Sequence, residues 1–133
     1  MLTEKDYCDY ETCVALKELG YDGYCDAYYH LFDDEDDARN SFECAYGFDF
    51  QNSNNIYRVG APLLYQAQKW LREEHNLHIE VRWYSNLWYE YEVKESEGKV
   101  VAEGCAFPTY EEALSTAVRM AVEWLKENED GRM

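Results

Sequence analysis

Residues 77–107, LHIEVRWYSNLWYEYEVKESEGKVVAEGCAF, predict three antiparallel β-strands. Ile79, Val81 and Trp83 alternate with polar residues, and residues 87–94 alternate in the same way. This period of two is typical of a strand that buries one face. We therefore expect one sheet face to be covered and the other to carry the charged side chains.

Two turn sequences join these strands. Ser85-Asn86 follows the first strand, and Glu97-Gly98 follows the second. The third strand is predicted over 99–107, where three small residues would allow a helix to pack closely: Ala102, Gly104 and Ala106. The region is predicted to be an antiparallel meander.

A helix is predicted on each side of the meander. The first runs from Ala61 to about Asn76 with Pro62 in its first turn. Its apolar stripe consists of Leu63, Leu64, Ala67, Trp70 and Leu71. The second begins at the capping box of Thr109 and Glu112 and runs to about residue 127, before a frayed tail over 128–133. Its stripe consists of Ala113, Leu114, Ala117, Val118, Ala121, Trp124 and Leu125. Residues 61–127 thus predict an α-β-β-β-α unit.

The first 60 residues are less regular. Asp9 is suited to cap a helix over 10–19, which Gly20 would end. The acidic run 33–37 is predicted to be a loop or the exposed start of a helix. Residues 41–57 fit either short strands or an ordered loop. The fold class is predicted to be α+β, with residues 1–133 in a single domain.

Composition excludes several classes of function. The chain has 133 residues and a net charge of -16, and 47% of its residues are hydrophobic, too many for a disordered acidic tail. Such a charge disfavours direct binding to nucleic acids and to anionic membranes. Residues 1–60 carry 14 acidic and 4 basic side chains. Five cysteines without a disulfide framework, and the lack of a signal sequence, lead us to expect a cytoplasmic protein with free thiols.

Three resemblances accompany these patterns. The element order over 61–127 resembles the double-stranded-RNA-binding fold, but Tyr110, Glu111 and Glu112 stand where that family has lysines, so RNA binding is not implied. The run GCAFPTYEEALSTAVRMAVEWL resembles the strand-to-helix end of HicB-type antitoxins. The segments ETCVALKELGYDG, LYQAQKWLREEHNLHIEV and PTYEEALSTAVRMAVEWL are together similar to short uncharacterised proteins of gut Bacteroidales and their phages or mobile elements. This last similarity implies an accessory role in a mobile element and brings no catalytic residues.

No metal, cofactor or catalytic site is predicted. His75 and His78 lack further ligands nearby in sequence, and the set Cys8, Cys13, Cys25 and His30 lacks the knuckle spacing of zinc sites. The run 33–37 lacks the order of a calcium loop. The sheet-face set Glu80, Glu90, Glu92 and Arg82 is interpreted as an ordinary solvated surface.

The abundance of aromatic and acidic residues instead suggests binding to another protein. The candidate residues are Tyr28, Tyr29, Asp33, Asp34, Glu35, Asp36, Asp37, Tyr84, Trp88, Glu90 and Glu92. We expect a non-catalytic module that recognises a partner with a basic surface, in its sharper form an inhibitor that mimics nucleic acid. The alternatives are a small metal-dependent hydrolase using Asp33, Asp34, Asp36 and Asp37, and an antitoxin-like partner. The oligomeric state stays open.

Overall fold

The computed structural model describes residues 2–44, 50–52, 57–85 and 88–130, with residues 129 and 130 described by their backbone only. The chain divides into two compact units, Met1–Leu63 (unit 1) and Leu64–Met133 (unit 2). Both contain helices and antiparallel strands, so the predicted α+β class is confirmed. In the described residues, no helix is long and apolar enough to cross a membrane.

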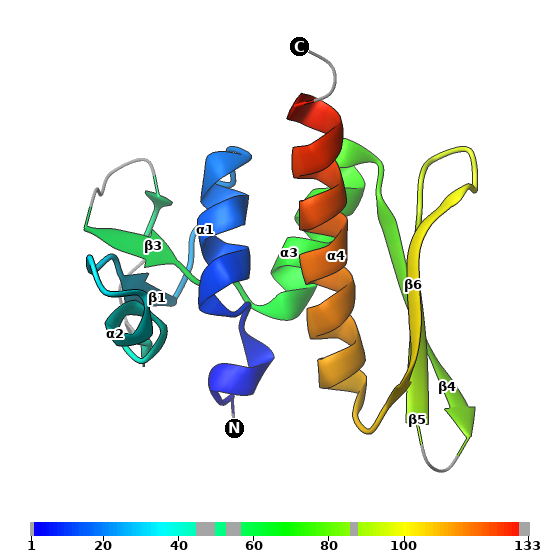
Figure 1. Ribbon diagram of the computed structural model, residues 1–133, viewed down its shortest axis with the longest axis horizontal. Coiled ribbons are helices and arrows are strands. Elements are labelled where there is room, and N and C mark those ends of the chain that lie inside the picture. Colours follow the sequence, from blue (N-terminus) through cyan, green and yellow to red (C-terminus); the bar gives the residue numbers. More distant parts are fainter. Residues whose placement is uncertain (1, 45–49, 53–56, 86–87, 131–133) are drawn as a thin grey trace. The chain divides into compact units, whose positions relative to one another are not determined.

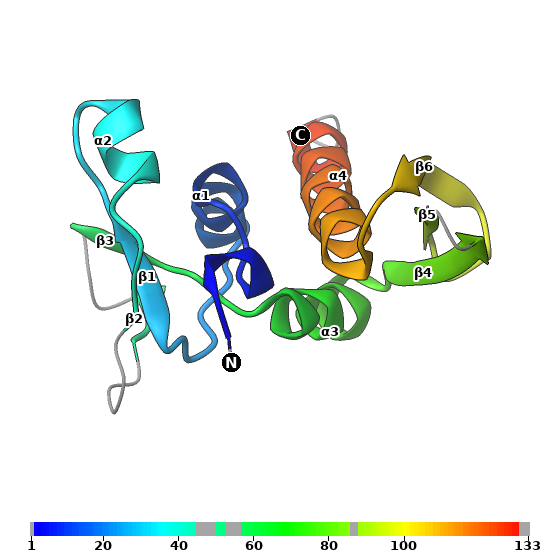
Figure 2. The same ribbon diagram turned by 90° about the horizontal axis from the view of Figure 1, so that it is seen from below.

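Unit 2 is a three-stranded sheet with two helices on one face (Figures 1 and 2). The strands are antiparallel in the order β4-β5-β6, and α3 and α4 contact each other and the sheet. The elements are α3 (Leu64–His75), β4 (His78–Ser85), β5 (Trp88–Lys94), β6 (Val100–Phe107) and α4 (Tyr110–Asp130). The predicted meander and its flanking helices are therefore confirmed. The predicted turn at Ser85-Asn86 extends beyond the described residues.

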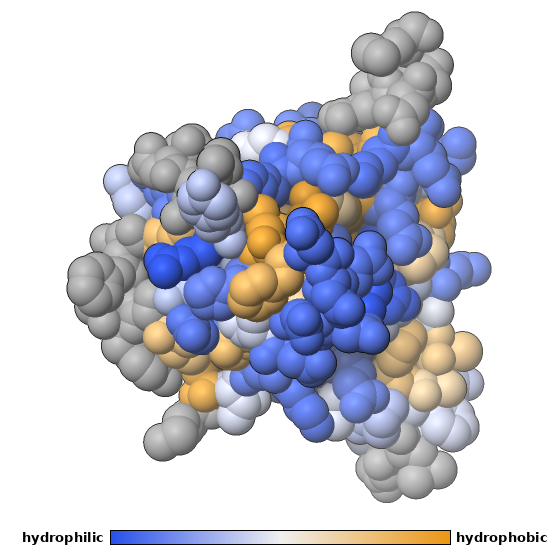
Figure 3. Space-filling model, turned by 60° about the vertical axis from the view of Figure 1, so that its left-hand side comes forward, coloured by the Kyte–Doolittle hydropathy of each residue, from blue (hydrophilic) through white to orange (hydrophobic). Residues whose placement is uncertain are grey.

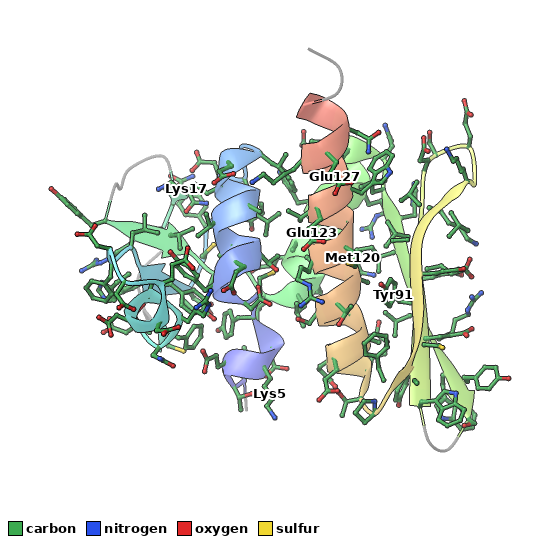
Figure 4. All side chains as sticks on the ribbon, in the orientation of Figure 1. Lys5, Lys17, Tyr91, Met120, Glu123 and Glu127 are labelled. Carbon is green, nitrogen blue, oxygen red and sulfur yellow. The ribbon has the colours of Figure 1, made fainter. Side chains whose placement is uncertain are left out.

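The core of unit 2 lies between α4 and the sheet. Every residue of the predicted α4 stripe is buried except Trp124, which is half-buried. The hydroxyl of Thr109 accepts a hydrogen bond from the Glu112 N–H at 3.1 Å, as the capping box predicts. Tyr91 of β5 points toward α4 (Figure 4) and is 4% exposed. Its ring lies over Gly104 of β6, where an added Cβ would be 2.6 Å from Cε1 of Tyr91. The small residue thus accommodates a neighbouring tyrosine rather than a helix.

The ends of these elements differ from the prediction. Pro62 precedes α3 rather than occupying its first turn. α4 continues to Asp130, beyond the predicted end, and the Asn128 side chain donates a hydrogen bond to the Trp124 carbonyl at 2.8 Å. Trp83, assigned to the core by alternation, is 62% exposed. Burial falls along β4, from buried Ile79 through half-buried Val81, because the helices cover only the first half of this edge strand.

Unit 1 begins with a 3₁₀ turn (Glu4–Asp6) and helix α1 (Tyr10–Glu18). Asp9 caps α1 by accepting a hydrogen bond from the Thr12 N–H at 2.8 Å. At the other end Gly20 has φ +98°, and the N–H groups of Gly20 and Tyr21 donate to the carbonyls of Lys17 and Leu16. This is a Schellman ending, which needs the left-handed conformation that glycine adopts without strain. Both predicted ends of α1 are therefore confirmed to within a residue.

A second small sheet in unit 1 was not predicted. Its antiparallel strands lie in the order β2-β1-β3, formed by β1 (Ala27–His30), β2 (Glu43–Cys44) and β3 (Arg58–Gly60). α1 packs against β3, and helix α2 (Glu35–Arg39) contacts β1. Strands this short show no readable alternation, and their pairing joins residues about 15 positions apart between β1 and β2 and about 30 between β1 and β3. Of the two possibilities left open for residues 41–57, short strands or an ordered loop, a two-residue strand is present at β2, whereas residues 45–49 and 53–56 lie outside the described part.

Candidate functional site

The acidic run 33–37 starts helix α2 and is exposed along its length. Asp34 is the N-cap, and its Oδ1 accepts hydrogen bonds from the N–H groups of Asp36 and Asp37 at 2.8 and 3.1 Å. Carboxylates are favourable at a helix N-terminus, because the first N–H groups carry partial positive charge. Of the two predicted structures for this run, the exposed helix start is confirmed.

Arg39 neutralises only part of this negative charge. It pairs with Glu11 of α1, with Glu35 at 3.2 Å and with Asp36 at 2.9 Å. The hydrogen bond to Glu11 and the nearby carboxylates raise the pKa of the Arg39 guanidinium. In the described residues, Asp33 and Asp37 form no ion pair, and both side chains are exposed.

A groove of about 480 Å³ lies beside α2, between the end of β1 and the start of β2. Aromatic and acidic residues line most of it, and we call it the acidic groove: His30, Phe32, Asp37, Asn40, Ser41, Phe42 and Glu43. The His30 and Phe32 rings are stacked, with centroids 5.6 Å apart and planes at 24°. Phe32 is 51% exposed, so this aromatic floor is open to solvent. Figure 3, turned to bring this unit forward, shows small hydrophobic areas surrounded by hydrophilic side chains.

Glu43 supplies a fixed carboxylate at one wall of the acidic groove. The Tyr28 hydroxyl donates a hydrogen bond to its Oε2 at 2.7 Å, and His30 Nε2 lies 3.4 Å from the same oxygen. The Tyr28 hydrogen bond, followed by the one from His30, lowers the pKa of Glu43. Arg58 lies over the Tyr28 ring at 4.8 Å from its centroid. Glu43 is therefore ionised at neutral pH and held in place from two sides.

Ser41 ties the two sides of the acidic groove together. Its hydroxyl accepts a hydrogen bond from the His30 N–H at 2.8 Å and donates to the Ala38 carbonyl at 2.6 Å. These bonds connect β1 to the end of α2. The groove is thus supported by hydrogen bonds within the unit.

Tyr29 does not belong to this surface. It is 2% exposed and packs against Tyr10 and Phe42, with ring centroids 5.7 and 5.4 Å away. Burial raises the pKa of its hydroxyl, which lies 3.5 Å from the Cys8 carbonyl. Tyr29 is a core residue, and its inclusion among the exposed candidates was wrong. Tyr28, the preceding residue of β1, is half-buried and donates a hydrogen bond to the groove residue Glu43.

The remaining candidates lie in unit 2, at the β4–β5 hairpin. Tyr84 is 65% exposed and its ring stacks on that of half-buried Trp88, with centroids 6.0 Å apart and planes at 15°. Glu90 and Glu92 lie on the outer sheet face and both pair with Arg82, Glu90 at 3.2 Å. Arg82 also lies 3.7 Å from Glu80. Unlike Asp33 and Asp37, these carboxylates are ion-paired, because Glu80, Glu90 and Glu92 share Arg82, and Lys94 Nζ lies 3.5 Å from Glu80.

The chain matches no protein-family model, and no curated protein or solved structure is significantly similar to it. The resemblances to RNA-binding domains, antitoxins and mobile-element proteins stay predictions.

The potential metal ligands do not converge. In the described part of the chain, no three or more His, Cys, Asp or Glu side chains are grouped as a metal site would require. Cys8, Cys13 and Cys25 are buried, and burial raises the pKa of all three thiols, that of Cys25 to about 12. The Cys13 Sγ donates to the Cys8 carbonyl at 3.4 Å. These cysteines are neutral core residues at pH 7.

Sequence reasoning missed the aromatic floor of the acidic groove. His30 and Phe32 lie at the end of β1 and just after it, whereas Phe42 precedes β2, and the pairing of β1 with β2 brings the two segments together. The available signal was the alternation of Ala27 and Tyr29 with Tyr28 and His30, which four residues are too few to establish.

Proposed function

We propose that this protein is a non-catalytic binding module that recognises a basic surface of another protein through the acidic groove and the adjoining run 33–37. One observation carries the proposal. Asp37 and Glu43 present exposed carboxylates in the same lining as the exposed Phe32 ring, and Asp33 is exposed in the adjoining run. Among the described residues, the cation nearest to this run in sequence is Arg39. Its guanidinium already pairs with Glu11, Glu35 and Asp36.

This combination suits lysine and arginine side chains. A guanidinium or ammonium group forms charge-assisted hydrogen bonds with carboxylates, and it is also attracted to the face of an aromatic ring. Phe32 provides such a ring at 51% exposure, and Asp37 and Glu43 lie in the same groove lining. Exposed charge on this scale chiefly raises the association rate and excludes acidic partners.

In its sharper form, the module imitates nucleic acid. Its carboxylates would take the place of phosphates and occupy the site of a DNA- or RNA-binding protein. The 14 acidic and 4 basic residues of unit 1 support this form, as does the resemblance to proteins of phages and mobile elements. A partner of this kind is itself basic, so a single capture experiment addresses both forms.

The test compares Asp33→Asn/Asp37→Asn with the matched variant Glu73→Gln/Glu97→Gln, whose acids are exposed in unit 2 outside the groove. Both variants remove two charges. Each is used as bait in lysate of a gut Bacteroidales species, washed at low and high salt, and the captured proteins are identified by mass spectrometry. We expect a basic protein that is released by salt and that binds the groove variant roughly tenfold more weakly, from about 0.5–1 kcal/mol per exposed charge.

Binding of that protein is then measured with purified components, with DNA or RNA as competitor. Displacement of nucleic acid by the wild type supports mimicry, whereas a ternary complex restricts the function to protein binding. Equal weakening by both variants would show that net charge, and not this groove, drives binding. A lysate that yields no salt-sensitive basic partner contradicts the proposal as a whole.

A further inference from the structure

Unit 2 contains a second cavity, unrelated to the acidic groove of unit 1. It has a volume of about 330 Å³ and lies where the end of α3, the β5–β6 turn and the last turns of α4 come together. Its size falls at the lower end of the range for small-molecule sites, roughly 300–1,000 Å³. In Figure 1, the C-terminal end of α3 and the later turns of α4 lie side by side.

Three apolar residues, Leu77, Trp124 and Leu125, take part in a lining that is otherwise polar. Leu77 is 1% exposed and Leu125 is 6% exposed. Half-buried Trp124 lines the same cavity, and so does His75, whose ring is held by an edge contact with Trp70 at 4.7 Å. The Leu77 N–H donates to the Leu71 carbonyl at 3.1 Å, which fixes the chain as it leaves the helix. An alkyl chain placed here would contact chiefly the half-buried Trp124 ring, because Leu77 and Leu125 expose little surface.

The polar part of the lining contains two acidic residues among histidine, asparagine and serine side chains. Glu74 and Glu95 are its two carboxylates, and no lysine or arginine belongs to its described lining. α3 ends at His75, where Asn76 takes the left-handed conformation with φ 55°. The last carbonyls of a helix carry a partial negative charge that favours a cation. The two carboxylates and the C-terminal end of α3 would therefore all attract a positively charged group.

We propose that this pocket binds a small organic cation, an alkylammonium or guanidinium group, with its charge between Glu74 and Glu95 and its alkyl part on Leu77, Leu125 and Trp124. A free amine and a lysine or arginine side chain share this chemistry. The indole ring adds attraction because tryptophan is the aromatic side chain that binds cations most strongly. A neutral molecule of the same shape gains only the apolar contacts.

The test is an NMR titration that follows the Trp124 indole N–H, assigned with Trp124→Phe, and the amides of residues 74–77 and 95–96. The probes are cadaverine, agmatine and N-acetyl-lysine methylamide, with 1,5-pentanediol as the neutral counterpart of cadaverine. We expect saturable shifts with the cations and none with the diol. Tighter binding of the lysine derivative would identify a protein side chain as the source, and tighter binding of cadaverine or agmatine a free amine.

Two variants of equal charge change complete the experiment. Glu74→Gln/Glu95→Gln should weaken binding at least about tenfold, the effect of losing a charge-assisted hydrogen bond. Glu73→Gln/Glu97→Gln, outside the cavity lining, should leave it unchanged. Unperturbed amide spectra verify that both variants fold. The proposal is overturned by no saturable shift with any cation, by equal shifts with the diol, or by unaltered affinity in the pocket variant.

Discussion

Replacing Gly104 by alanine should destabilise unit 2 through one defined clash. Gly104 pairs with Tyr91 across β5 and β6, and an added Cβ would lie 2.6 Å from Cε1 and 3.1 Å from Cζ of the Tyr91 ring. The φ of Gly104 lies outside the left-handed region, so the backbone accepts alanine. The conflict is therefore between two side chains.

The size of the effect follows from how little room the Tyr91 ring has. It is 4% exposed, faces α4 and lies 5.7 Å from the Phe107 ring between centroids. Forcing an extra methyl group into such packing costs about 1–3 kcal/mol. Alanine also leaves the unfolded chain less conformational freedom than glycine does, and this offsets about 0.5–1 kcal/mol of the packing cost. The middle of the first range less the middle of the second gives an expected net loss of about 1 kcal/mol in the free energy of unfolding.

Urea unfolding followed by tryptophan fluorescence measures this loss. All four tryptophans lie in unit 2, so the signal reports on that unit. The same substitution is made in a Tyr91→Leu background, where the ring is gone and Gly104→Ala should be neutral or slightly stabilising. A double-mutant cycle gives the coupling energy. A loss below about 0.5 kcal/mol, or an equal loss in both backgrounds, would refute the assigned clash.

Two further predictions concern the backbone and the buried thiols. Ala106 is exposed and has φ 70°, so Ala106→Gly should raise the stability of unit 2 by about 0.5–1 kcal/mol in the same assay, and unchanged or lower stability would contradict the strain. Cys8, Cys13 and Cys25 have raised pKa values, so above about pH 9 the unfolded chain loses thiol protons that the folded chain keeps. Their contribution to stability is complete below that pH and declines toward about pH 12 for Cys25. Urea unfolding followed by circular dichroism should show this decline, and Cys25→Ala should reduce its slope whereas Cys105→Ala, at an exposed position, should not. Equal slopes in the two variants would count against the buried thiols as the cause.

Local patterns in the sequence were sufficient for much of the fold. Asp9 and Gly20 bound α1 because a cap and a left-handed residue act on their immediate neighbours. The alternation over 79–94 predicted β4 and β5, and the capping box at Thr109 predicted the start of α4. The acidity of residues 33–37 and their exposure were also predictable, since a run of charges cannot be buried without partners.

The tertiary structure decided which aromatic residues reach the surface. Alternation placed Trp83 with Ile79 on the covered face, but the helices end their cover before the hairpin. Tyr29 is buried and Tyr28 is partly exposed because β1 pairs with β2 and β3, partners that are distant in sequence.

The two cavities have the same origin. Each combines residues from segments that only folding brings together, so no spacing in the sequence marks them. The chain by itself determined its class, its charge and its strongest helices and strands, because these depend on composition and on neighbours a few residues apart. The short sheet of unit 1, the acidic groove and the pocket beside Trp124 depend on contacts between distant residues, which only the packed structure specifies.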